Sequence, residues 1–185
     1  MPISFDLEVK KALLDVAQYL AISGRTAPKA KGWDDISIAI LTDEEKEQVA
    51  LKMESLAVEK GKPTFKRDAD NTRNSSVVVL FGVKGSKPRE LDCSACGFTS
   101  CAEFVAAEKT VRLDFSGPNC EFAIMDLGIA LGSATKMCSI FGVDSRIMYT
   151  IGVAAKKLNL IDADIILGLP LAATGKNIYF DRPKV

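Results

Sequence analysis

Apolar residues recur every three to four positions in several parts of the chain, which is the spacing of one helix face. Three such stretches predict amphipathic helices: residues 5–22, 43–60 and 146–158. The first is expected to end before Gly24. The second begins at a capping box formed by Thr42 and Glu45, and Gly61 with Pro63 is its stop signal.

Other stretches are β-branched and apolar without helical spacing, and these predict strands. They are residues 36–41, 75–83, 110–115 and 163–172. The stretch 75–83 is the strongest strand pattern in the chain, while Gly168 and Pro170 interrupt the last strand. The tail 178–185 is expected to be extended.

A long buried helix is predicted from Pro118 to Gly142. Its apolar face comprises Ala123, Leu127, Ala130, Leu131, Ala134, Met137, Cys138 and Phe141. The order of these elements predicts one α+β domain over residues 1–185, with a mixed central sheet flanked by helices.

Composition narrows the classes of function. The chain has 185 residues, enough for a full hydrophobic core, and 24 basic residues balance 24 acidic ones. This balance argues against nucleic acid or an anionic membrane as a partner. No apolar run reaches the length of a membrane span and no secretory pattern is visible, so we expect a cytoplasmic protein. The absence of histidine excludes imidazole catalysis and histidine-ligated metals.

Four cysteines form the main chemical feature of the sequence. Cys93, Cys96 and Cys101 have the spacing C-x₂-C-x₄-C, and Cys120 follows after eighteen residues. In a reducing compartment such cysteines are more often metal ligands or redox groups than structural disulfides. The spacing favours an iron–sulfur cluster, because a zinc site usually pairs two C-x₂-C knuckles. A structural zinc site and free or disulfide-forming thiols remain as alternatives.

The surroundings of these cysteines favour an anionic group. Cys101 and Cys120 each open a predicted helix, so free backbone N–H groups are expected at both thiolates. Gly97 allows a tight fold around sulfur, and the Gly-Pro pair at 117–118 directs the chain into Cys120. The fifth cysteine, Cys138, lies on an apolar helix face and is expected to be an inert thiol.

The segments "CSACGFTSCAEFVAA" and "GPNC" resemble the four-cysteine ferredoxin-type domain of anaerobic electron-transfer and corrinoid iron–sulfur proteins. Further matches between Arg25 and Pro183 resemble the ferredoxin-domain-containing proteins of bacteria and archaea. The resemblance implies a ferredoxin-type segment over residues 84–141. It implies a [4Fe–4S] cluster held by four ligands: Cys93, Cys96, Cys101 and Cys120.

A second resemblance is to nitroreductase-type flavoproteins. It rests on "RTAPKAKGWDDISIAIL", "DLGIALGSATKMCSIFGV" and "ILGLP". It implies an FMN site, with Arg25 and Lys29 as phosphate contacts, and a homodimer that shares the cofactor site. The arginine-rich phosphate clamp of that family is missing here. Gly128 and Gly132 form G-x-x-x-G in the long helix, where a neighbouring element or a flat cofactor would approach closely.

Three functions follow as hypotheses. The first is an iron–sulfur redox protein that passes single electrons to a partner protein through one [4Fe–4S] cluster. The second is a reductase that binds both flavin and cluster, and the third is a protein with a structural Cys₄ zinc site. The sequence leaves open whether the protein is an enzyme.

Overall fold

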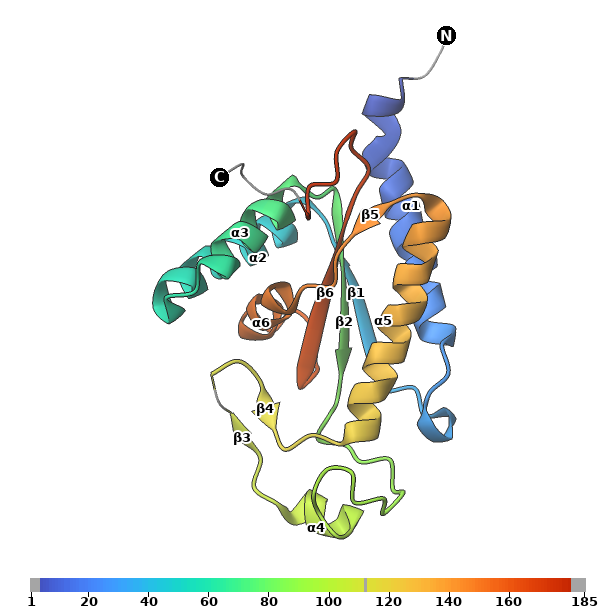
Figure 1. Ribbon diagram of the computed structural model, residues 1–185, viewed down its shortest axis with the longest axis vertical. Helices are drawn as coiled ribbons and strands as arrows, with labels where there is room; N and C mark the ends of the chain where they lie inside the picture. The colour runs from blue at the N-terminus through green and yellow to red at the C-terminus, as the bar shows by residue number, and fades with distance from the viewer. Residues whose placement is uncertain (1–3, 112, 181–185) are drawn as a thin grey trace.

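The structure, a computed structural model, describes residues 4–111 and 113–180. It confirms the α+β fold, a central sheet flanked by helices (Figure 1). The helices are α1 (Phe5–Thr26), α2 (Asp43–Lys60), α3 (Pro63–Asn74), α4 (Cys101–Ala106), α5 (Glu121–Phe141) and α6 (Tyr149–Lys157), with a short 3₁₀ helix, η1 (Ala30–Gly32). The strands are β1 (Ile36–Leu41), β2 (Val77–Val83), β3 (Thr110–Val111), β4 (Ser116–Gly117), β5 (Asp144–Ser145) and β6 (Ile165–Ala172).

The main sheet has the strand order β1-β2-β6-β5, and its pairings are antiparallel. β2 is buried along its whole length, as its continuous apolar sequence predicts. Within the predicted strand at 110–115, Thr110 and Val111 form β3, which pairs with β4 in a short hairpin, and residues 113–115 belong to the connection. Arg112 lies outside the described residues.

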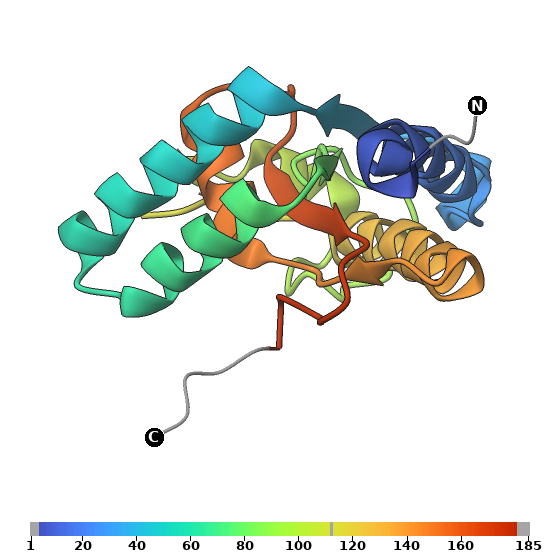
Figure 2. The same ribbon diagram turned by 90° about the horizontal axis from the view of Figure 1, so that it is seen from above.

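Helices cover both faces of the sheet, with α1 and α5 on one side and α2, α3 and α6 on the other (Figure 2). Alternate residues of β2 enter the two resulting cores. Val79 and Phe81 pack toward α1 and α5, whereas Val78 and Leu80 pack toward α2, α3 and α6.

Two helix boundaries differ from the prediction because a glycine and a proline were interpreted as stops. Gly24 lies inside α1, where a β-carbon would come within 2.4 Å of the Phe81 ring, so glycine lets the helix lie close to the sheet. Pro63 is the first residue of α3, which the sequence analysis missed. Thr42 is the N-cap of α2, but its side chain makes no capping hydrogen bond.

The described part of the predicted tail, residues 178–180, is not extended. Residues 178–180 form a turn, and the hydroxyl of buried Tyr179 lies 2.9 Å from Ser75 Oγ. The rest of the predicted tail is outside the described residues.

α5 is buried on one face only, which corrects the prediction of a fully buried helix. Its outer face includes exposed Met125, Ile129, Ile140 and Phe141. By length and composition α5 could cross a membrane, with a mean hydropathy of 1.3 and 33% of its most apolar window buried. The sequence pattern, in which no apolar run reaches the length of a membrane span, did not predict this property of α5. It is weak evidence for a membrane, because the core helix of a soluble protein meets the same criterion.

Candidate metal centre

The cysteine-bearing segment lies at one end of the main sheet. In Figure 1 the loop after β2, helix α4 and the β3–β4 hairpin gather beside the first turn of α5. Residues 84–100 contain no regular helix or strand, and α4 follows directly. The end of β2 and the start of α5 therefore position this segment.

One pocket brings the four predicted ligands together, although Cys120 lies eighteen residues beyond the other three. We call it the cysteine pocket, and its four pocket cysteines are Cys93, Cys96, Cys101 and Cys120. They range from exposed at Cys93 to buried at Cys120, and all are free thiols. The sequence prediction that these residues act as one group agrees with this placement.

Left-handed backbone conformations shape the loop around Cys93. Glu90, Asp92 and Ser94 have φ between 45° and 59°, and Gly97 has φ of 88°. Four such residues within eight positions bend the chain sharply around the first two pocket cysteines. Of these, Gly97 is the residue that the sequence analysis identified.

The start of α4 is capped by side chains instead of being left open. Asp92 Oδ1 accepts a hydrogen bond from the Cys101 N–H at 2.6 Å, and Ser100 Oγ accepts one from the Glu103 N–H at 3.1 Å. Hydrogen bonds from the hydroxyl and N–H of Thr99 lower the pKa of Glu103. The expected free N–H groups at Cys101 are therefore largely occupied.

Cys120 is held more rigidly. Its N–H donates to Gly85 O at 2.7 Å, which ties the start of α5 to the chain that leaves β2. A β-carbon at Gly85 would come within 2.1 Å of Asn119, so glycine allows this close approach. Cys120 is the N-cap of α5, and its carbonyl oxygen accepts a hydrogen bond from the Ile124 N–H in the first turn. The N–H groups of the first turn of α5 have no intrahelical acceptors, and the Cys120 side chain makes no capping hydrogen bond to them.

The space between the thiols is small. The cavity measures about 10 Å³, enough for about one water molecule. Among residues 4–111 and 113–180, no three ligand-type side chains are grouped closely enough to hold a single metal ion.

A buried ionic network lies against the cysteine pocket. Arg89 lines the pocket and is only 1% exposed. Its Nε donates to Asp126 Oδ2 at 2.8 Å, and its Nη1 donates to Asp35 Oδ2 at 2.6 Å. Its Nη2 is buried without a hydrogen-bond partner in the described part of the chain. No local sequence pattern marks Arg89 as a buried arginine.

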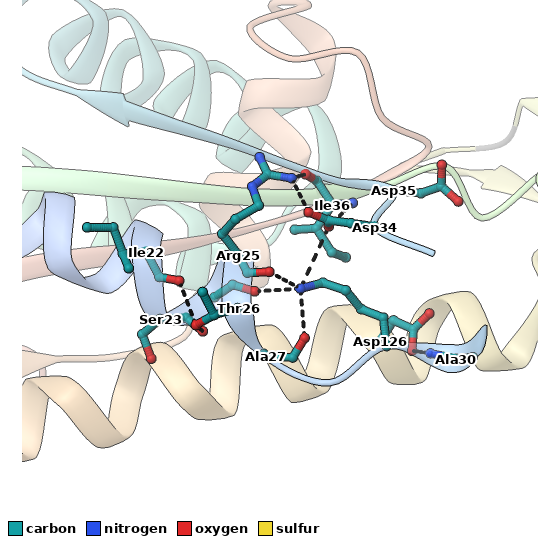
Figure 3. A network of polar contacts seen from close by, with 12 residues as sticks. Ile22, Ser23, Arg25, Thr26, Ala27, Ala30, Asp34, Asp35, Ile36 and Asp126 are labelled. Carbon is teal, nitrogen blue, oxygen red and sulfur yellow. Dashed lines mark hydrogen bonds and ion pairs between the residues drawn. The ribbon is translucent and has the colours of Figure 1, made fainter. Parts of the chain in front are cut away.

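Figure 3 shows how the first two flavin candidates are used within the chain. Arg25 Nη1 donates to Asp34 at 2.6 Å and to Ile36 O at 2.8 Å. Lys29 Nζ donates to three carbonyl groups at the end of α1, those of Gly24, Arg25 and Ala27. Both side chains have structural partners, and Lys29 would have to give up its helix-capping bonds to bind a phosphate.

The other two flavin candidates, Gly128 and Gly132, lie on the exposed face of α5. A β-carbon at either position would have no atom within 4 Å among the described residues. The expectation of a closely packed neighbour is therefore wrong within the described chain. The face remains open to a cofactor or a second chain.

Three remaining side chains have structural roles. Cys138 is buried on α5, and burial raises the pKa of its thiol, as expected for an inert cysteine. Asp126 and Arg146 have separate partners. Asp126 accepts from Arg89 and from Ala30 N, while Arg146 donates to Tyr179 O.

Comparison with known proteins assigns a family. Residues 116–182 match the family described as "Uncharacterized protein containing a ferredoxin domain (DUF2148)". An "Uncharacterized protein" of Archaeoglobus fulgidus is 52% identical over 166 residues, which are 90% of this chain and 89% of that protein. The chain belongs to this ferredoxin-domain family. The span matched by the family description contains Cys120 but not the other three pocket cysteines.

Solved structures with a similar fold are nitroreductases. A Desulfitobacterium hafniense nitroreductase with bound FMN matches with a TM-score of 0.57 and 10% identity over 100% of this chain and 84% of that chain. Nitroreductase CinD from Lactococcus lactis, in complex with nicotinic acid, matches with a TM-score of 0.57 and 14% identity. The match covers 90% of this chain and 83% of that chain. Nitroreductase A from Vibrio parahaemolyticus matches with a TM-score of 0.53 and 15% identity. The match covers 96% of this chain and 61% of that chain. At these identities the likeness shows the fold alone, and the predicted nitroreductase-like fold is confirmed.

Proposed function

We propose that the four pocket cysteines hold one [4Fe–4S] cluster and that the protein passes single electrons to and from a partner protein. The observation that supports this most is that all four predicted ligands line one pocket. When bound, the cluster supplies one-electron transfer at a potential set by its surroundings.

The residues of the pocket suit an anionic cluster better than a zinc ion. Cys93 and Cys96 come from an irregular loop, Cys101 is the first residue of α4, and Cys120 is the N-cap of α5. Three closely spaced cysteines joined by a remote fourth are typical of iron–sulfur clusters. Arg89 presents a buried cationic group with a spare donor. A structural zinc site needs four ligands on one ion, with Zn–S distances of about 2.3 Å. Such sites usually pair two C-x₂-C knuckles, and this chain has one, formed by Cys93 and Cys96.

The exposed side of the pocket, at Cys93, is the proposed place of electron exchange with a partner. The loop from Leu91 to Ala95 is exposed, while Cys120 faces the core. A partner would therefore approach the loop side of the pocket.

We predict that iron removal unfolds the cysteine segment locally. Among the described residues of 86–122, only Arg89, Phe104 and Cys120 are buried, so few apolar contacts order this stretch. Chelation under reducing conditions should make it sensitive to protease while β1 and β2 stay protected. Mass spectrometry of early cleavage sites measures this. Early cuts spread evenly over the apo chain would contradict the coupling.

A second candidate function is a reductase that binds FMN as well as the cluster. The nitroreductase-like fold favours it, and so does the open α5 face that displays Gly128 and Gly132. The same exposed apolar face would suit a homodimer. Arg25 and Lys29 are then the phosphate candidates, although each has partners within the chain.

We predict that the purified protein does not retain stoichiometric FMN, because both cationic candidates are engaged in structural contacts. Anaerobic titration with FMN followed by gel filtration tests this. The reductase would be supported instead by tight FMN binding that Gly132→Leu abolishes with iron content unchanged. Glu59→Leu, an exposed change on α2 across the sheet, is the control.

A further inference from the structure

Arg89 is placed unusually for a residue with only a structural role. It is almost completely buried, and two of its three nitrogens donate to carboxylates on different elements, Asp126 of α5 and Asp35 before β1. Burying a guanidinium is costly unless its charge and its donors are matched. Nη2 remains without a partner, and such a group calls for an explanation.

The cysteine pocket supplies that explanation. Among the described residues that line it, Arg89 is the one basic side chain, and the two acidic ones are Asp92 and Glu121. A thiolate-bound cluster is anionic and gains one further negative charge on reduction. A buried cation with a spare N–H is the group that such an occupant would bind, through a hydrogen bond to sulfur.

Resting on the proposed function, we infer that Arg89 is the buried counter-charge of the cluster and that it sets the cluster's reduction potential. Asp126 and Asp35 hold the guanidinium against the pocket. Asp126 also accepts a hydrogen bond from Ala30 N at 2.8 Å, which links η1 to α5 (Figure 3). Arg89 joins the cysteine segment to the same carboxylate.

The sign of the effect follows from electrostatics. A positive charge near the cluster stabilises the reduced, more negative form, so removing it lowers the potential. A negative charge held beside the guanidinium acts in the opposite sense. Substitutions at Arg89 and Asp126 should therefore shift the potential in opposite directions, which a loss of packing alone would not produce.

The test uses spectroelectrochemical titration of the full chain with its cluster. In Arg89→Gln, the ratio of reduced to oxidised cluster at a fixed potential should fall about tenfold or more, a shift of about 59 mV for one electron. In Asp126→Asn the ratio should rise, and this variant decides the question if Arg89→Gln does not fold. Lys87→Gln is the matched control, because Lys87 also pairs with Asp35 at 2.8 Å but is 56% exposed and does not line the pocket.

Each outcome separates this inference from the proposed function. A lowered potential in Arg89→Gln, or a raised one in Asp126→Asn, with Lys87→Gln close to wild type supports it. A wild-type cluster whose potential neither substitution moves overturns the role of Arg89 and leaves the electron carrier standing. A wild-type chain that assembles no cluster overturns both.

Discussion

Replacing any one of the four pocket cysteines by serine is expected to abolish stable cluster binding. Loss even of a residue behind a metal ligand costs about 10- to 100-fold in metal affinity, so loss of a ligand should cost more. We expect retained iron to fall about tenfold or more, with Cys120→Ser the most severe, because Cys120 is the buried ligand fixed to Gly85. Iron content after gel filtration measures the effect.

Cys138→Ser is the control for these four variants. Cys138 does not line the cysteine pocket, and its thiol hydrogen-bonds to Ser145, which a serine hydroxyl could also do. This variant should keep its iron. Iron lost from Cys138→Ser but kept by Cys120→Ser would show that the fourth ligand is wrongly assigned.

Gly152→Ala is expected to be the most destabilising glycine substitution. Gly152 lies in α6, and a β-carbon there would come within 1.7 Å of the carbonyl oxygen of Ile166 in β6. Backbone atoms of a central strand cannot move aside as a side chain can. We expect a loss of about 3 kcal/mol or more, the upper end of overpacking effects. For a chain of this size that lowers the midpoint of thermal unfolding by about 6–12 °C.

Gly128→Ala is the matched helical control for Gly152→Ala. It introduces the same methyl group where the described structure has no atom within 4 Å. Alanine is the better helix former by about 1 kcal/mol, so this variant should be slightly more stable than wild type. Equal losses at both positions would contradict the packing of α6 on β6.

The sequence predicted most of the fold because the apolar periodicity is strong in β2 and along the inner faces of α1 and α5. Helix α3 was not predicted, because a proline such as Pro63 can mark the start of a helix as well as its end. Charged residues also surround the few apolar residues of α3. Gly24 misled in a similar way, since its role depends on Phe81, which is far away in the sequence. Such errors arise where a residue's meaning is set by a tertiary contact.

The sequence indicated the cysteines of the candidate site but not the charged residues around them. The spacing of the pocket cysteines is a local signal, and their common pocket agrees with it. Arg89, Asp35 and Asp126 come from three separate segments, and nothing in the sequence around them indicates burial. The network could be found only once the fold had brought these segments together.

The most direct test of the central claim is the iron and acid-labile sulfide content of the full chain purified without oxygen. If the pocket cysteines hold one [4Fe–4S] cluster, we expect about four irons and four sulfides per chain, with a paramagnetic signal on reduction by one electron. One zinc per chain without sulfide, or no bound metal after reconstitution with iron and sulfide, would contradict it.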